Sequence, residues 1–282
     1  MAGFLARFCP RALAEGRPAL AGIVNVTPDS FSDGGAHADP EAALAHATRL
    51  LADGADLLDL GAESTRPGFS PVPAGEELRR LLPALRAIRA AHPRAVISVD
   101  TRKAAVAAAA LDAGADVVND VSSFEDPDMA PLVARRGAGV VLMNGWREHV
   151  GARPRAAAPG ALGAWVLAGL RGFLARALEA GIAPENVCLD PGFGFGLKGA
   201  DNDEVLRALP RIVAGCAPCP VLAGASRKHF VCAAFPEAGG DRDRATLLFH
   251  AACARAGAAV LRVHDVAAHA APALARAAAR LV

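Results

Sequence analysis

The sequence predicts an α/β protein, a single-domain (βα)8 barrel that takes in residues 1–282. Three observations support this fold. Apolar segments of strand length recur along the chain, helix-length segments rich in alanine and leucine separate them, and several of these end in a similar glycine-containing run. Strands that are apolar almost throughout are typical of a parallel sheet covered by helices. At this length, closure into a TIM barrel is the natural arrangement.

Each predicted strand is a short apolar burst. In chain order the eight strands are predicted at residues 20–26, 56–61, 95–100, 116–122, 139–144, 186–192, 220–226 and 260–265. The intervening helices end in LLADGAD before the second strand, ALDAGAD before the fourth and ACARAGAA before the eighth. Glycine at such a place readily adopts the left-handed conformation that ends a helix. An open doubly wound sheet is the alternative, because the number of strands does not prove that the barrel closes.

Composition and charge restrict the kinds of partner. The chain has 282 residues, 53% of them hydrophobic, and a net charge of +1, so nothing indicates binding to nucleic acid or to a membrane. Arg7 and Arg11 interrupt the N-terminal segment before it reaches signal-peptide length, and no later stretch offers about 18 uninterrupted apolar residues. We expect a soluble, cytoplasmic protein that acts on small molecules.

The cysteines are dispersed among apolar neighbours, as is typical of reduced thiols packed in a cytosolic protein. Cys216 and Cys219 form a CxxC pair, but no second pair or Cys/His partner at metal-binding spacing completes a zinc site. Two incidental cysteines near the start of a strand are the favoured interpretation, and a redox role is the alternative.

The predicted strand ends are unusually polar. In a (βα)8 barrel the active site is built at the C-terminal ends of the strands. The polar residues there are Asn25, Glu63 to Arg66, Asp100, Asn119, Asn144, Asp190, Ser226 to Lys228, Arg262 and His264. Such residues also cap helices, but Asn119, Arg262 and His264 lie inside apolar segments, where valine or leucine would be usual. Because a buried charge without a partner is costly, we expect the cluster to meet a polar ligand.

Seven motifs, in order, resemble those of the dihydropteroate synthase family. They are GIVNVTPDSFSDGG (22–35), LDLGAESTRPG (58–68), SVDTRK (98–103), AGADVVNDVSS (113–123), LDPGFGFG (189–196), GASRK (224–228) and RVHDV (262–266). The resemblance implies a pterin-binding barrel. Such a barrel joins 6-hydroxymethyl-7,8-dihydropterin diphosphate to 4-aminobenzoate, releases pyrophosphate and forms 7,8-dihydropteroate for folate synthesis.

The resemblance assigns pterin binding to Asp100, Asn119, Met143, Asp190 and Lys228. A pterin is a flat ring edged with hydrogen-bond donors and acceptors. A buried site selects it by matching each of them, since a mismatch leaves a desolvated polar group without a partner. Asp190 suits the amino and ring N–H edge, and Lys228 suits the carbonyl edge. The GFGFG run (192–196) is interpreted as a flexible loop beside this pocket, because its spacing does not fit a phosphate cradle.

A second group suits the diphosphate. Arg262 offers a forked cation to phosphate oxygens and His264 a nearby donor. Asn25 offers an oxygen for Mg²⁺, which otherwise binds water and substrate phosphates. The resemblance adds Thr65. The alternatives are a buried ion pair for Arg262, with Asp265 or a neighbour, and a core histidine for His264. The expected catalytic residues are Asn25, Asp100, Lys228, Arg262 and His264.

Loops after the first two strands are expected to cover the site. Bulk water would intercept a cation-like transition state at the pterin methylene, so the site has to close during reaction. In the family, the counterparts of residues 27–35 and 64–70 cover the site and help to form the aminobenzoate pocket. The matching residues here are Phe31, Thr65, Arg66 and Pro67. Ser226 and Arg227 are expected near the aminobenzoate carboxylate. An arylamine is nucleophilic when neutral, so no general base is assigned.

The segment after the fifth strand departs from the family. The family reads Met-His-Met there, whereas this chain has Met143 followed by Asn144, and residues 151–163 carry extra Arg, Pro and Ala. The departure bears on the shape of that loop and on substrate scope.

Two rival functions share the same barrel. A catalytically silent pterin-binding paralogue would show damage at Asn25, Asp100, Lys228 or Arg262, and all four are intact. A pterin-dependent methyltransferase needs neither an aminobenzoate pocket nor a diphosphate site, so the SFSDGG, ESTRPG and SRK runs disfavour it. By resemblance, a homodimer is expected.

Overall fold

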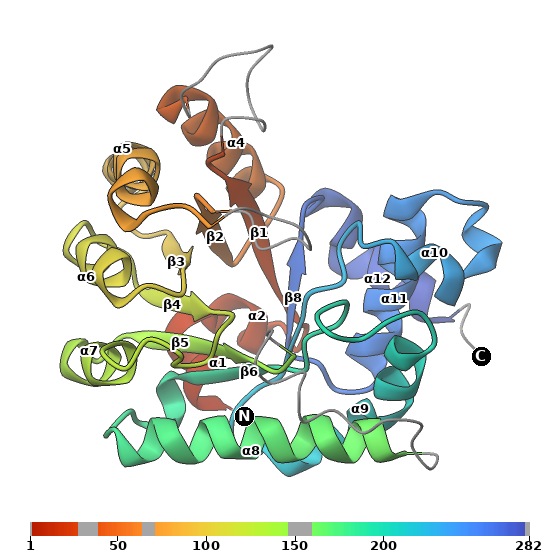
Figure 1. Ribbon diagram of the computed structural model, residues 1–282. Coiled ribbons are helices and arrows are strands. Elements are labelled where there is room, and N and C mark those ends of the chain that lie inside the picture. The colour runs from red at the N-terminus through yellow and green to blue at the C-terminus, as the bar shows by residue number, and fades with distance from the viewer. Residues whose placement is uncertain (1, 28–38, 64–70, 146–159, 280–282) are drawn as a thin grey trace.

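A computed structural model of the protein describes residues 2–27, 39–63, 71–145 and 160–279. Eight parallel strands form its centre (Figure 1). They are β1 (Ala19–Asn25), β2 (Leu57–Gly61), β3 (Val96–Asp100), β4 (Val117–Asp120), β5 (Gly139–Met143), β6 (Val187–Asp190), β7 (Leu222–Ala223) and β8 (Val260–Val263). Each lies within the residues predicted for it, except that β1 begins one residue earlier.

The strands close into a nearly complete barrel. Hydrogen-bonded neighbours follow the order β6-β5-β4-β3-β2-β1-β8-β7, so the first strand pairs with both the second and the last. Between β6 and β7 the ring is completed by a parallel bridge from Leu189 to Val221, where the Leu189 N–H donates to the Pro220 carbonyl over 3.0 Å. The predicted (βα)8 barrel is therefore confirmed over the open doubly wound sheet.

A ring of helices surrounds the strands (Figure 1). The helices between and after the strands are α4 (Pro40–Ala52), α5 (Ala74–Ala91), α6 (Ala104–Asp112), α7 (Met129–Arg136), α8 (Ala161–Glu179), α9 (Asp201–Cys216), α10 (Phe230–Ala234), α11 (Arg242–Arg255) and α12 (Ala271–Ala279). Short 3-10 turns lie at η2 (Pro184–Asn186), η3 (Pro236–Ala238) and η4 (Ala267–His269). The glycines predicted to follow helices, Gly54, Gly114 and Gly257, have φ of 105°, 102° and 98°, as that role requires.

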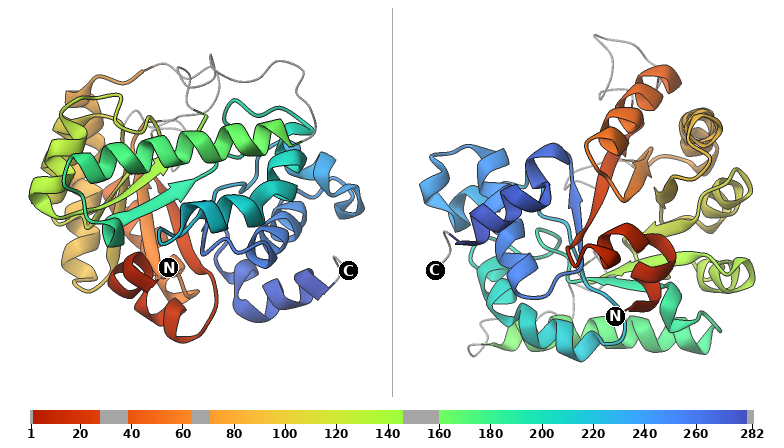
Figure 2. Two further views of the ribbon diagram at one scale, coloured as in Figure 1. Left: turned by 90° about the horizontal axis from the view of Figure 1, so that it is seen from below. Right: turned by 180° about the vertical axis from the view of Figure 1, so that it is seen from behind.

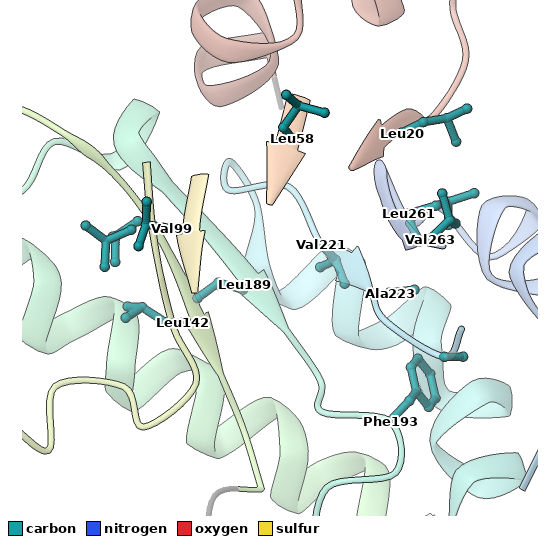
Figure 3. Close-up of a cluster of buried hydrophobic side chains, with 14 of the residues drawn as sticks. Leu20, Leu58, Val99, Leu142, Leu189, Phe193, Val221, Ala223, Leu261 and Val263 are labelled. Atoms are coloured by element: carbon teal, nitrogen blue, oxygen red, sulfur yellow. The ribbon is translucent and has the colours of Figure 1, made fainter. Parts of the chain in front are cut away.

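The main hydrophobic core lies between the strands and the helices. Strand side chains alternate between the helix layer and the barrel interior, so Leu58 and Leu60 of β2 and Ile97 and Val99 of β3 face outward. Figure 3 shows outward residues from several strands, including Leu58, gathered in this cluster. The main core therefore lies outside the ring of strands and is separate from the barrel interior.

Two helices before the first strand close the N-terminal end of the barrel. They are α1 (Ala2–Phe8) and α2 (Pro10–Ala14), which lie across one end of the strands in Figure 2. Phe4 and Phe8 pack there against residues such as Leu57, Val117 and Val260 from the beginnings of strands. Because this end is filled by apolar side chains, only the other end is left for polar chemistry.

Helix α8 is, among the described residues, the one helix whose length and composition would allow it to cross a membrane. Arg171 and Arg176 interrupt its apolar residues. Its apolar stripe includes Val166, Leu170 and Phe173, which are buried against the barrel. An apolar stripe buried in this way is typical of a helix that packs on the outside of a barrel.

Candidate active site

The barrel interior changes from apolar to polar along the strands. Near the strand beginnings the inward residues are apolar, as Leu57 and Val117 show. Toward the C-terminal ends the same alternation places polar residues inward. We call the following set the polar end of the barrel: Asn25, Asp59, Asp100, Asn119, Asp190 and Arg262. Strand register brings some of them side by side, since Asp100 of β3 pairs with Asn119 of β4, and Met143 of β5 pairs with Asp190 of β6.

Arg262 lies between two carboxylates. Its Nε donates to Asp59 Oδ2 over 2.5 Å, and its Nη2 donates to Asp100 Oδ2 over 2.9 Å. Asn119 Nδ2 donates to the same Asp59 oxygen over 3.1 Å. The ion pair considered for Arg262 therefore exists, but its partners are Asp59 and Asp100 and not Asp265. Four side chains from β2, β3, β4 and β8 are joined in this way.

Two carboxylate oxygens in this network lack a partner. Asp59 Oδ1 and Asp100 Oδ1 are both buried, and neither has a hydrogen-bond partner among the described residues. A buried acceptor without a donor costs free energy, so such atoms mark places where a ligand can bring donors. The polar end of the barrel is therefore set up to receive N–H or O–H groups.

Asp59 was missed by the sequence analysis. It stands between Leu58 and Leu60, at an inward position in the middle of a buried strand. The signal that singled out Arg262, a charged residue inside an apolar segment, applies equally to Asp59. Asp59 lies two residues before the end of β2, whereas most of the predicted residues lie at strand ends.

Burial raises the pKa of Asp100 to about 7. The Arg262 guanidinium opposes this shift, while the carboxylates of Asp59, Glu77 and Asp120 add to it. Burial also raises the pKa of Asp190, against the opposing effects of its hydrogen bond from Gly192 N–H and the nearby Lys228 and Arg262 cations. Burial therefore favours the protonated form of both carboxylates, and perturbed acids of this kind are typical of functional sites.

Lys228 is enclosed by the GFGFG loop. Its Nζ donates to the Phe193 carbonyl and lies 4.1 Å from the centroid of the Phe195 ring. A β-carbon at Gly194, which has φ of 76°, would come within 2.8 Å of Lys228 Cδ. Burial lowers the pKa of Lys228 to about 7, with Asp190 opposing the shift. The loop thus packs directly on the lysine that the sequence analysis assigned to the pterin.

Asp190 and Arg262 lie in the same part of the barrel. A β-carbon at Gly224 would be 3.6 Å from Asp190 Oδ2 and 3.9 Å from Arg262 Cβ. Since Lys228 and Arg262 are also among the charges that act on Asp190, residues from β6, β8 and the segment after β7 converge. This convergence was the spatial requirement of the sequence-based prediction.

The segments after β7 and β8 are joined through Ser226 and His264. Ser226 Oγ accepts from the His264 backbone N–H over 3.2 Å and lies 2.8 Å from His264 Nδ1. Arg227 points elsewhere, because its exposed guanidinium pairs with Asp243 of α11 at 2.6 Å. Within the described part of the chain, Ser226 contacts another predicted site residue, His264, whereas the Arg227 guanidinium pairs with Asp243.

Four predicted residues lie outside the described ranges, and two others lie at the ends of strands. Phe31, Thr65, Arg66 and Pro67 lie outside the described residues, as does most of the atypical segment after Asn144. Met143 is buried beside Val121, with Phe195 packed against them. Asn25 ends β1 at an inward position, and its backbone pairs with Gly61.

Asn144 does not face the barrel interior. Its backbone N–H donates to the Asp190 carbonyl over 2.9 Å, while its side chain turns outward to α8. There a β-carbon at Gly169 would come within 2.3 Å of Asn144 Oδ1. At Asn144, the departure from Met-His-Met therefore alters the contact with α8.

Glu63 and the CxxC pair have structural partners. Glu63 accepts from the Val72 N–H at 2.7 Å and from Lys103 Nζ at 3.0 Å, so it anchors backbone at the end of β2. Burial raises the pKa of Cys216 and Cys219 to about 11, which keeps both thiols protonated and weakly reactive at neutral pH. Both features favour packing over catalysis.

Comparison with known proteins identifies the barrel. Residues 21–264 match the family described as "Pterin binding enzyme". A dihydropteroate synthase from Streptococcus pyogenes is 40% identical over 262 residues, which is 91% of this chain and 93% of that protein. The chain belongs to the dihydropteroate synthase family.

Other members of the family agree. A probable bifunctional folylpolyglutamate synthase/dihydropteroate synthase from Haloferax volcanii is 43% identical over 248 residues. The matched region is 88% of this chain and 29% of that longer protein. The dihydropteroate synthase structure from Xanthomonas albilineans with 4-aminobenzoic acid has a TM-score of 0.82 at 42% identity, with 94% of each chain covered. The same enzyme in complex with 7,8-dihydropteroate has a TM-score of 0.78 at 40% identity, again with 94% of each chain covered. The family assignment therefore holds for sequence and fold alike.

Proposed function

We propose that this chain, a transferase of folate synthesis by family, joins 6-hydroxymethyl-7,8-dihydropterin diphosphate to 4-aminobenzoate at the polar end of the barrel. The observation that carries the proposal is the meeting of two charge groups there. Asp190 and Lys228 form one group, and Arg262 between Asp59 and Asp100 forms the other. One group matches the edge of a heterocycle, and the other matches an anion that has to leave.

The pterin ring binds through its edge. Asp100, Asn119 and Asp190 supply oxygen acceptors for its amino and ring N–H groups, and Lys228 donates to its carbonyl. The unpartnered oxygen of Asp100 supports this assignment, because a pterin N–H would satisfy it. Met143 supplies an apolar surface for the face of the ring.

The diphosphate leaves toward Arg262 and His264. The bond between the pterin methylene carbon and the diphosphate oxygen breaks, and the oxygen keeps the electron pair as pyrophosphate departs. The aminobenzoate nitrogen then forms the new bond to that carbon with its lone pair and loses a proton to solvent. Asp59 fixes Arg262 through Nε before substrate arrives, so less reorganisation is needed when charge develops on the leaving group.

Magnesium fits this site only as a companion of the diphosphate. No group of three or more His, Cys, Asp or Glu side chains that could hold a metal occurs among the described residues, so the protein offers no complete ligand set there. Asn25 supplies one amide oxygen, and Mg²⁺ usually takes its other ligands from water and substrate phosphates. When bound, the ion would neutralise charge on the departing pyrophosphate. Asn25 is its proposed protein ligand.

Aminobenzoate binds beside Ser226, and the loop residues Phe31, Thr65, Arg66 and Pro67 complete its pocket, with Arg227 reaching it only on release from Asp243. Thr65 also contributes to the diphosphate site. The bond from His264 N–H to Ser226 Oγ supports a shared boundary between the aminobenzoate and diphosphate regions. We further propose that the protein works in the cytoplasm as a homodimer, with no membrane and no nucleic acid as partner.

The decisive experiment measures pyrophosphate release with both substrates and Mg²⁺. Wild-type protein should turn over, while Lys228→Ala and Arg262→Ala should each lose at least about 100-fold in kcat/KM, as expected when a buried charged contact is removed. Lys198→Ala, at an exposed lysine, is the matched control and should keep wild-type activity. A wild-type protein that binds the pterin but releases no pyrophosphate would establish the silent paralogue instead.

A further inference from the structure

Helix α11 holds the turn after β7 at three points. Asp243 Oδ1 accepts from Arg227 Nε at 2.6 Å, Thr246 Oγ1 accepts from the Arg227 backbone N–H at 3.0 Å, and His250 Nε2 accepts from the Ala225 N–H at 3.1 Å. The three helix residues are spaced by three and four positions, so they share one face of α11. Arg227 has a left-handed φ of 58°, which is unfavourable for a residue with a β-carbon. The helix face therefore supports a turn that needs support.

A hydrogen-bond chain continues from this turn through two buried histidines. His250 Nδ1 lies 3.0 Å from His269 Nε2, and His269 Nδ1 lies 2.7 Å from the Asp265 carbonyl oxygen. The Ala225 N–H can only donate, so His250 Nε2 carries no proton and His250 Nδ1 does. His269 Nε2 then accepts, and His269 Nδ1–H donates to the carbonyl. Every member of the chain fixes the tautomer of the next.

The pair is kept neutral by its surroundings. His250 is fully buried, and His269 is 2% exposed. Burial lowers the pKa of both rings below the usual 6.5. The other charged groups that face the pair are Lys228 and His264 around His250, and Asp243 and Asp265 around His269. Protonation of either ring would replace an acceptor with a donor and break the chain, so the chain requires neutral rings.

Both ends of this hydrogen-bond chain, Ala225 and Asp265, lie beside residues of the proposed active site. Ala225 directly precedes the turn that carries Ser226 and Lys228, and Asp265 directly follows His264. Ser226 and His264 already touch through Ser226 Oγ, so the histidine chain forms a second connection behind the first.

We propose that His250 and His269 are positioning residues, which hold the turn bearing Ser226 and Lys228 in register with the segment bearing His264. The proposal rests on the proposed function, because those three residues are the ones assigned to aminobenzoate, pterin and diphosphate. The pair binds no substrate itself. Each of its four ring nitrogens already has a protein partner.

The test compares His250→Leu with His250→Gln in the pyrophosphate-release assay at pH 7.5. A glutamine amide can accept from the Ala225 N–H and donate toward His269, whereas leucine can do neither. We expect His250→Leu to lose about tenfold or more in kcat/KM for both substrates, because both oriented hydrogen bonds of His250 are lost, and His250→Gln to recover to within about threefold of wild type. His92→Gln, near the opposite end of the barrel, is the control and should match wild type.

Other outcomes would overturn the proposal. A His250→Leu protein with wild-type kcat/KM and only a lower melting temperature would show that the pair is structural alone. Equal losses in the leucine and glutamine variants would show that the hydrogen bonds do not matter. Failure of the proposed function is distinguishable, because wild-type protein would then release no pyrophosphate.

Two further measurements keep the test valid if His250→Leu does not fold. His269→Leu cuts the chain at η4, away from the turn, and should give a similar kinetic loss. In wild-type protein, nitrogen-15 NMR of the histidine rings should show both rings in the Nδ1–H tautomer at pH 7.5. A Nε2–H tautomer at either ring would contradict the chain directly.

Discussion

Asp59→Asn is the sharpest test of the charge network around Arg262. The substitution keeps the size and planarity of the side chain but removes the charge that faces Arg262 Nε at 2.5 Å. Arg262 then keeps a single carboxylate partner, Asp100. Asn119, which donates to the same Asp59 oxygen, keeps an acceptor if the new amide presents its carbonyl. The effect should therefore fall mainly on Arg262 and Asp100.

Two magnitudes follow from this geometry. A hydrogen bond to a charged group contributes about 1.5–3 kcal/mol, so kcat/KM should fall about 10- to 150-fold if the loss is felt in the transition state. Asp59 is also one of the charges that raise the pKa of Asp100 to about 7. Two like charges several Å apart repel by about 2 kcal/mol at an effective dielectric constant near 20, so that pKa should drop by about 1 unit or more.

The assay is the pH dependence of kcat/KM for the pterin diphosphate between pH 5 and 9. Asp100 is proposed to bind the pterin as a carboxylate, so its protonation should give wild-type activity an acid limb near pH 7, and in Asp59→Asn this limb should move to lower pH. Asp56→Asn is the matched control. Asp56 lies on the same strand segment and its side chain is 1% exposed, but it pairs with Arg11 and Arg17. It should lower stability and leave the pH profile alone. An unmoved acid limb in Asp59→Asn would refute the charge network.

Three other predictions test single contacts. Gly194→Ala brings a β-carbon within 2.8 Å of Lys228 Cδ at a positive φ, so kcat/KM for the pterin should fall about tenfold or more; wild-type kinetics would contradict the contact. In Gly169→Ala the new β-carbon would lie 2.3 Å from Asn144 Oδ1, so the free energy of unfolding measured in urea should fall by about 1–3 kcal/mol. Gly172→Ala, with nothing within 4 Å, should raise the free energy of unfolding by about 0.5–1 kcal/mol. Equal effects of the two substitutions would rule out the contact between α8 and Asn144. Because burial lowers the pKa of Lys228 to about 7, the pH profile of activity should also have an alkaline limb near pH 7 and so be bell-shaped, and Lys228→Arg, which stays protonated, should lose that alkaline limb if the lysine charge is its cause.

The fold could be predicted because its signals are local and repeated. Each strand is a short apolar run, and each of Gly54, Gly114 and Gly257 marks the end of a helix whatever the rest of the chain does. Barrel closure is a different kind of property. It depends on a single bridge between Leu189 and Val221, and no residue type in either segment announces which distant strand will be its neighbour.

The sequence predicts several of the residues that meet at the polar end of the barrel, but not how they pair with one another. Asn119 and Arg262 stand out because they interrupt apolar strands, and Asp100 stands out because it is a charged residue at the end of one. Asp59, which accepts from both Asn119 and Arg262, also interrupts an apolar strand but lies before the strand end, where the other predicted residues cluster. The histidine chain has no sequence signal, because His250 lies in a helix and joins residues that are distant in sequence. Only coordinates reveal that kind of contact.

The ion pairs of Arg262 are compatible with its proposed role in binding the diphosphate. The first describes the residue without substrate, and the second describes it with substrate bound. A buried guanidinium needs counter-charges when no substrate is present, and Asp59 and Asp100 provide them. Of these two carboxylates, Asp100 is the one assigned to the pterin, whereas Asp59 has no assigned ligand. In the proposed reaction a diphosphate would engage Arg262, Asp100 would turn its oxygens to the pterin, and Asp59 would keep the guanidinium in place. Asp59 is the third charge of this network. Because Asp59 stays paired with Arg262, the arginine could bind the leaving group while Asp100 binds the pterin.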